Sequence, residues 1–261
     1  MKRVRLDTLL AERGLFETRS SAAAHVRAGR VQLGQDGPKA LKPGQLVPPE
    51  VDLLVDEGPR YVSRGGIKLA NALDALRIDV DGRNCLDVGA STGGFTDCML
   101  QRGARRVITV DVAFGQLAWG LRHDDRVRVI EGVNARELDP NVLPYEPSFA
   151  TIDVSFISLK KVLPAVASAV TEDGEILALV KPQFEVKREA VGKNGVVRAP
   201  SERRAAILSV ADAARELGLA VRGFAPSGLP GPKGNLETFI WCGRQGESLD
   251  GIEAVVRRME A

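Results

Sequence analysis

The chain has 261 residues, of which 44% are hydrophobic and 27% are charged, and its formal net charge is +2. These fractions are ordinary for a soluble protein, and the length allows one large domain with a substantial core plus a small one. The three cysteines, Cys85, Cys98 and Cys242, are odd in number and widely spaced, which argues against a disulfide framework or a structural zinc site and favours a reduced, cytoplasmic setting.

The charge is distributed unevenly along the chain. Residues 1–49 contain nine Lys or Arg and four Asp or Glu, a net charge of +5, which leaves about −3 for the rest. A basic module joined to a near-neutral one indicates a nucleic-acid-binding domain attached to a second domain with another function. No apolar run approaches the ~18 residues that span a bilayer, and no export signal is evident, so we expect neither secretion nor membrane insertion.

The first 59 residues predict a small α+β module. Helical spacing of leucines favours a helix over residues 4–14, and a second helix is expected over residues 18–29. Short strands are expected at residues 31–33, 42–47 and 51–55. A glycine-rich and arginine-rich stretch then marks a linker at residues 60–66.

Residues 67–245 read as a larger α/β domain. A helix at residues 67–76 precedes strands that alternate with helices, which is typical of a doubly wound, Rossmann-like parallel sheet. The last two of its seven strands lie close together in sequence, so one should be antiparallel, and residues 246–261 should form a C-terminal helix or tail. The expected strands are 85–88, 106–111, 127–130, 149–153, 176–180, 219–225 and 236–242; the expected helices are 94–102, 115–122, 159–170 and 201–217.

A glycine turn after the first of these strands is the clearest candidate ligand site. Apolar residues 85–88 lead into Gly89-Ala-Ser-Thr-Gly-Gly94 and then a helix, where backbone N–H groups and the helix dipole can meet a ligand. The turn lacks both the dinucleotide fingerprint and the P-loop pattern, which disfavours an NAD-linked enzyme. About twenty residues on, Asp111 ends the next strand, where such folds place a carboxylate against ribose hydroxyls.

Polar residues at other strand ends form a second candidate set. Asp153 and Lys181 each follow a buried apolar strand, and Glu237 begins the final strand. If that strand is antiparallel, its start shares an edge with the ends of the others, so the three should meet. Lys68 lies early in the helix that precedes the first sheet strand.

The glycine turn resembles the cofactor turn of S-adenosylmethionine (SAM) methyltransferases, and the Lys-Asp-Lys-Glu set resembles the tetrad of FtsJ-like 2′-O-ribose methyltransferases. The N-terminal pattern, Arg5-Leu-Asp-x-x-Leu with Thr18-Arg-Ser, Gly29-Arg-Val and Lys42-Pro-Gly, resembles an S4 RNA-binding domain. Together they resemble the TlyA family, with further matches at Tyr61-Val-Ser-Arg-Gly-Gly, Asp153-Val-Ser-Phe-Ile-Ser-Leu and Leu229-Pro-Gly-Pro-x-Gly-Asn-Leu-Glu.

This resemblance implies SAM-dependent 2′-O-methylation of cytidine in ribosomal RNA within ribosomal subunits, with no metal. It implies catalytic roles for Lys68, Asp153, Lys181 and Glu237. The implied cofactor contacts are Asp87, Gly89, Ala90, Ser91, Thr92, Gly93, Gly94, Phe95, Asp111, Val112, Asn134, Ala135 and Asp153. The expected RNA contacts are Arg5, Arg19, Arg27, Arg30, Lys39, Lys42 and Arg64.

Several alternatives remain open from the sequence. The chain could be a non-catalytic RNA-binding or ribosome-assembly protein, or a membrane-active haemolysin, a label that some family members carry. Lys181 could accept the hydroxyl proton or stabilise charge. We expect Trp119 in the core, and we expect the polar loop 183–198 either to close over RNA as a lid or to be a plain solvated loop. The oligomeric state is left undetermined.

Overall fold

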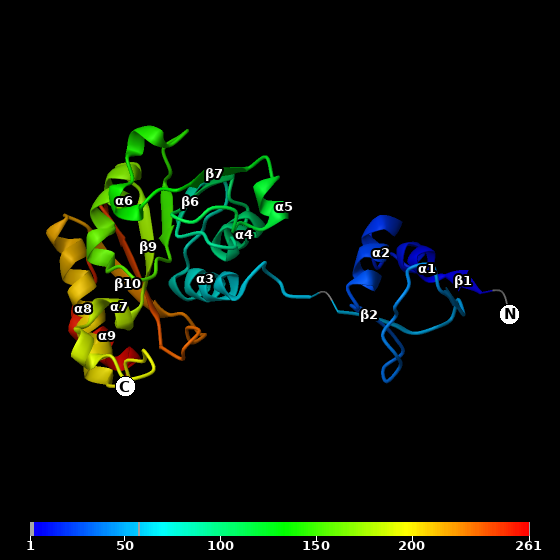
Figure 1. Ribbon diagram of the computed structural model, residues 1–261. Helices are drawn as coiled ribbons and strands as arrows, with labels where there is room; N and C mark the ends of the chain where they lie inside the picture. Colours follow the sequence, from blue (N-terminus) through cyan, green and yellow to red (C-terminus); the bar gives the residue numbers. More distant parts are fainter. Residues whose placement is uncertain (1–2, 57, 261) are drawn as a thin grey trace. The chain divides into compact units, whose positions relative to one another are not determined.

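The structure, a computed structural model, describes residues 3–56 and 58–260. The chain divides into two compact units, Met1–Arg60 and Tyr61–Ala261 (Figure 1).

The first unit contains two short helices and two antiparallel strand pairs. Helices α1 (Leu6–Glu12) and α2 (Arg19–Arg27) confirm the predicted helix pair, and the Thr18 side chain caps α2 by accepting a hydrogen bond from the Ser21 amide at 3.1 Å. Strand β1 (Val4–Arg5) pairs with β3 (Leu46–Val47), and β2 (Val31–Leu33) pairs with β4 (Leu53–Val55). The core of the unit is formed by buried aliphatic residues that include Leu6, Leu10, Val26 and Val31.

The second unit contains a seven-stranded sheet of order β10-β11-β9-β8-β5-β6-β7. Strand β11 pairs antiparallel with both β9 and β10, whereas the pairs among β9, β8, β5, β6 and β7 are parallel, which confirms the predicted doubly wound sheet with an antiparallel final pair. The strands are β5 (Asn84–Val88), β6 (Arg106–Asp111), β7 (Val127–Glu131), β8 (Phe149–Ile152), β9 (Glu175–Val180), β10 (Ala220–Pro226) and β11 (Thr238–Gly243).

Helices cover both faces of this sheet and make a three-layer unit (Figure 1). One face packs against α3 (Arg64–Leu76), α4 (Gly94–Gln101) and α5 (Trp119–Arg122). The other packs against α6 (Leu163–Ala169), α8 (Pro200–Glu216) and α9 (Ile252–Met259). The short elements are α7 (Pro182–Glu185), η1 (Ala135–Glu137), η2 (Pro140–Val142), η3 (Leu159–Lys161) and η4 (Arg188–Ala190). In the described part of the chain, none of the helices combines the length and apolarity needed to cross a membrane.

Two boundaries and one side chain differ from the expectations, whereas the expected C-terminal helix forms. The linker expected at residues 60–66 is shorter, because Tyr61 is buried in the second unit's core and α3 already starts at Arg64. The C-terminal helix is α9, whose Val256 is fully buried against the sheet layer. The helix expected at 115–122 is reduced to the single turn of α5. Trp119, expected in the core, is the first residue of this turn and is 76% exposed.

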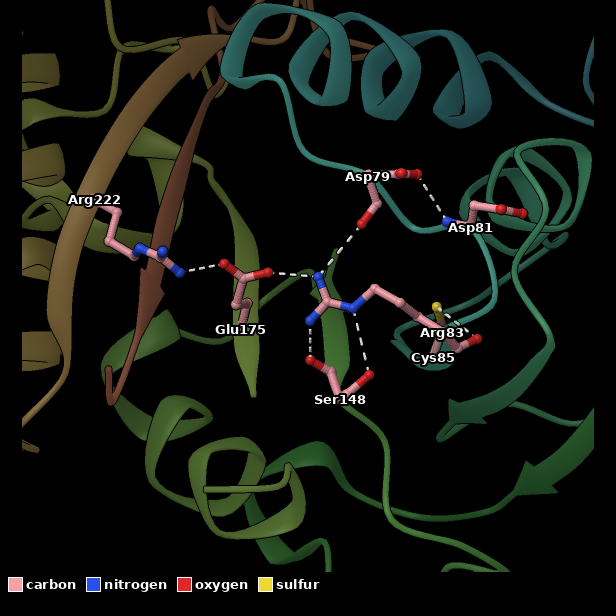
Figure 2. A network of polar contacts seen from close by, with 7 residues as sticks. All are labelled: Asp79, Asp81, Arg83, Cys85, Ser148, Glu175 and Arg222. Atoms are coloured by element: carbon pink, nitrogen blue, oxygen red, sulfur yellow. Dashed lines mark hydrogen bonds and ion pairs between the residues drawn. The ribbon is translucent and has the colours of Figure 1, made fainter. Parts of the chain in front are cut away.

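The edge of the sheet where β8 and β9 begin is held by an ion-pair network (Figure 2). Glu175, at the start of β9, accepts from both Arg83 and Arg222. The Arg83 guanidinium also donates to the backbone and side-chain oxygens of Ser148, next to β8. Two arginines on one partly buried carboxylate thus join three neighbouring segments by charge-assisted hydrogen bonds at this edge.

Candidate functional site

The carboxyl ends of the parallel strands surround two adjoining cavities. The chain leaves β5 toward β6 on one side, and β8 lies on the other, which makes this the topological switch point where ligands bind in such sheets. The tetrad cavity, of about 680 Å³, takes its name from Lys68, Asp153, Lys181 and Glu237, which all line it. The turn cavity, of about 840 Å³, shares Gly89, Ser91, Asp153, Ser155, Phe156 and Phe184 with the tetrad cavity.

The four residues form two ion pairs. Lys68 Nζ lies 2.6 Å from Glu237 Oε2, and both side chains are almost fully buried, at 10% and 1% exposed. Lys181 Nζ lies 2.6 Å from Asp153 Oδ1 and also donates to Ser155 Oγ at 3.0 Å. The second pair is the more accessible, with side chains 12% and 23% exposed. The structure therefore brings the predicted tetrad together as one buried pair and one pair open to the cavity.

Sheet register explains why residues so far apart in sequence meet. Thr238 at the start of β11 pairs with Val180 at the end of β9, so the residues that flank this pair, Glu237 and Lys181, emerge at the same edge. Asp153 leaves β8 at that edge because β8 is parallel to β9. Lys68 reaches the site from the second turn of α3, the helix that packs beside α4.

Two glycines of the turn are required by the backbone. Gly89 has φ +84°, and a Cβ atom there would lie 2.5 Å from the Asp153 carbonyl oxygen. Gly93 has φ +94°, and a Cβ atom would collide with the Leu121 side chain at 2.3 Å. Gly89 thus keeps the cavity wall thin, while Gly93, predicted to touch the cofactor, faces the packed core and lines neither cavity.

Asp111 supports the glycine turn from the end of β6. Its Oδ2 accepts the Ser91 amide and its Oδ1 accepts the Ala113 amide, both at 2.8 Å. Ser91 itself has φ +49°, a left-handed conformation that this hydrogen bond stabilises. Each carboxylate oxygen retains a further acceptor position, and Asp111 lines the turn cavity, so it can also accept from a ribose hydroxyl.

Asp87 lies beneath the turn and is completely buried. Burial raises the pKa of its carboxyl to about 7, and hydrogen bonds from Thr96 Oγ1 at 2.6 Å and Thr151 Oγ1 at 3.1 Å oppose this rise. Asp87 is among the residues that line the tetrad cavity, so this buried acidic residue is part of the floor of the site.

The remaining predicted cofactor residues divide between the two cavities. Val112, which is 67% exposed, lines the turn cavity with Asn134 and Ala135. Ala90, Thr92, Gly94 and Phe95 line the tetrad cavity. A thin glycine wall, a carboxylate placed for a ribose and an exposed apolar side chain for a base together fit a nucleoside.

Two aromatic residues that the sequence did not single out stand between the cavities. Phe156 is 92% exposed and has φ +63°, which is uncommon for a bulky side chain. Its ring lies 5.3 Å from the ring of Phe184, and both line both cavities. The only sequence signal was a phenylalanine in the turn after a buried strand, beside Asp153. An exposed aromatic in a strained turn at a cavity mouth points to ligand contact.

The loop at residues 183–198, expected either as an RNA lid or as a solvated loop, is structured and attached to the loop that carries Glu237. Asn235 is 2% exposed; its Oδ1 accepts the Val197 amide at 2.9 Å and its Nδ2 donates to the Gly195 carbonyl at 2.8 Å. Gly195 and Val191 line the tetrad cavity. The loop therefore forms part of the cavity wall.

The predicted RNA-contacting residues lie in different settings. Arg5 and Arg19 both contact the buried Asp7, and the hydrogen bonds from Arg5 and then Arg19 lower the pKa of Asp7 to about 2. Arg27, Lys39 and Lys42 are exposed, and Arg30 is partly exposed. Arg64 belongs to the second unit, lines the tetrad cavity and donates to the Pro230 carbonyl at 3.2 Å. Among the described residues, no group of three His, Cys, Asp or Glu could hold a metal ion.

Comparison with known proteins agrees with this site. The model of the FtsJ-like methyltransferases matches residues 61–244. The 16S/23S rRNA (cytidine-2′-O)-methyltransferase TlyA of Mycobacterium tuberculosis is 46% identical, covering 98% of this chain and 97% of its own length. Hemolysin A of Brachyspira hyodysenteriae is 36% identical over 90% of this chain and 97% of its own. A solved hemolysin-named protein from Streptococcus thermophilus is 43% identical with a TM-score of 0.73, over 99% of this chain and 96% of that one.

Proposed function

Because this chain belongs to the FtsJ-like methyltransferase family, and within it to the TlyA group, we propose that it methylates the 2′-hydroxyl of cytidine in ribosomal RNA, with SAM as methyl donor. The observation that carries the proposal is the tetrad, Lys68, Asp153, Lys181 and Glu237, lining one cavity that adjoins the pocket behind the glycine turn. A non-catalytic RNA-binding protein would have no need of two ion pairs at this position.

The turn cavity is the proposed cofactor pocket. Asp111 would accept hydrogen bonds from the ribose, Val112 and Ala135 would flank the adenine, and the turn from Gly89 would face the methionine part. When bound there, SAM supplies an electrophilic methyl group on a sulfonium. Gly89 matters most in this arrangement, since a side chain would close the space between the turn and Asp153.

Lys181 is the proposed partner of the reacting hydroxyl. With the donor bound, methyl transfer would require the 2′-hydroxyl to be held in line with the methyl group and its proton to leave the oxygen. The Lys181 amine lies in the open pair, held by Asp153 and Ser155, where it can accept that proton or stabilise the developing negative charge as an ammonium. The buried Lys68–Glu237 pair, which lines the same cavity, would help to orient the Lys181–Asp153 pair.

Phe156 is the proposed platform for the target base. A ribose in the tetrad cavity requires its base to leave the RNA stack, and an extruded base needs a new surface. The exposed ring of Phe156, backed by Phe184, stands where such a base could stack.

The basic first unit is the proposed grip on the RNA, as an S4-type domain. Its exposed Lys39 and Lys42, with Arg27, present charge to phosphates, whereas Arg5 and Arg19 are partly neutralised by Asp7. A ribosomal RNA substrate implies ribosomal subunits as partners and action in the cytoplasm.

The test combines cells and purified components. Mapping 2′-O-methyl groups in rRNA from cells with and without the protein should reveal cytidine sites that disappear on deletion. Transfer of tritiated methyl groups from SAM to ribosomal subunits lacking the modification should depend on the protein. Unchanged maps together with no transfer would reject the proposal, and methylation on a base instead of a ribose would reject its chemistry.

A further inference from the structure

Glu185, the last residue of α7, joins the two loops that carry the open ion pair. Its Oε2 accepts from Ser158 Oγ at 2.5 Å, and its Oε1 accepts the Leu159 backbone amide at 2.7 Å. The carboxyl therefore binds the start of η3, in the loop after β8, from a position five residues beyond the end of β9. Burial raises the pKa of this carboxyl, and both hydrogen bonds oppose the rise, which is the environment of a bound carboxylate and not of a solvated one.

The loop after β8 and the loop after β9 contact each other at three places between the sheet edge and Glu185. Nearest the sheet, Asp153 pairs with Lys181, which also contacts Ser155. Next, the ring of Phe156 packs on that of Phe184. The contacts of Glu185 with Ser158 and Leu159 are the third of these places and lie farthest from the sheet. Without them, the exposed Phe156, whose left-handed backbone conformation is unfavourable on its own, would be held only from one side.

We propose that Glu185 is a positioning residue that fixes the loop after β8 against the loop after β9, and so sets the placement of Phe156 and of the Lys181–Asp153 pair toward the RNA nucleotide. The inference rests on the proposed function and adds to it a residue that touches no reacting atom. Its two hydrogen bonds are local, but they hold the loop that carries Phe156 and Asp153, and a displacement of about 1 Å at a reacting centre can lower a rate about 100-fold.

The substitution Glu185→Ala removes both acceptors, whereas Glu185→Gln keeps an oxygen for the Leu159 amide and a polar group for Ser158. In the full-length protein we expect kcat/KM for RNA to fall about 10- to 100-fold in Glu185→Ala, mainly through kcat, and to recover mostly in Glu185→Gln. Glu189→Ala, an exposed glutamate four residues on, is the matched control.

Hydrogen exchange supplies a readout that needs no activity. The Leu159 amide should exchange faster in Glu185→Ala than in wild type, and should stay protected in Glu185→Gln and in Glu189→Ala. Unchanged Leu159 protection, or wild-type kcat/KM in Glu185→Ala, would overturn the proposal. Equal loss in the Gln and Ala variants would also overturn it, since the carboxylate would then have a chemical role. An inactive wild type with the predicted exchange pattern would reject the proposed function and leave the loop contact standing.

Discussion

The buried Lys68–Glu237 pair should contribute strongly to stability as well as to the site. In Glu237→Gln the carboxylate charge is lost while Lys68, whose side chain is only 10% exposed, keeps its ammonium without a counter-charge. Breaking a buried pair in this way costs about 3–5 kcal/mol. For a unit of this size, about 2–4 °C of melting temperature accompanies each kcal/mol, so a drop of roughly 6–20 °C is expected.

Urea denaturation followed by tryptophan fluorescence measures this directly. Both tryptophans, Trp119 and Trp241, belong to the second unit, so the signal reports the unfolding of that unit. The double variant Lys68→Met/Glu237→Gln removes the orphaned charge and should be more stable than Glu237→Gln alone. Asp153→Asn, in the more exposed pair, should lose less stability. A Glu237→Gln unfolding free energy within about 1 kcal/mol of wild type would refute the view that this pair is desolvated.

Three further predictions concern the chemistry, the base platform and pH. Lys181→Met should leave SAM affinity nearly unchanged by calorimetry while methyl transfer falls by about 10²–10⁴-fold; near-normal turnover would reject the role. Phe156→Ala should weaken RNA turnover by about 10- to 100-fold, with Phe156→Tyr close to wild type in the same steady-state assay. Burial raises the pKa of Asp87 to about 7, above its unfolded value, so the unfolded chain binds fewer protons between pH 4 and 7 and stability falls as pH rises through that window. The urea midpoints of wild type and Asp87→Asn should therefore diverge between pH 4 and 7. Parallel pH profiles of the two proteins would contradict a raised pKa of Asp87.

The fold was largely predictable because its signals are local and repeated. Apolar runs ending in polar residues marked each strand, and their alternation with helical patterns required a parallel sheet. The short turn before β11 indicated an antiparallel final strand, and this direction alone brings Glu237 to the edge where Asp153 and Lys181 emerge. The convergence of the tetrad therefore followed from strand direction.

What could not be predicted depends on contacts between loops. The sequence around Trp119 has an apolar spacing that fits a buried helix, yet only one turn forms and the ring stays exposed. Phe156 has a backbone conformation that no residue preference indicates, and Glu185 reads as an ordinary polar residue until β8 and β9 are placed side by side. The early start of α3 arises from the burial of Tyr61 beneath it.

The strand order has a consequence for engineering. The segment from β5 to β7 builds the wall around Asp111, whereas the chain from β8 to β11 supplies three of the four tetrad residues, and within the sheet the two parts pair along the β5–β8 seam. A chimera that exchanges residues 84–131 with those of a relative would replace the Asp111 side of the proposed cofactor pocket as a block. The seam combines backbone pairing with the Thr151–Asp87 hydrogen bond, and Phe95 packs on Phe239 between the same two parts. Recombinants that keep Asp87 and Phe95 should therefore assemble with the tetrad of the recipient intact.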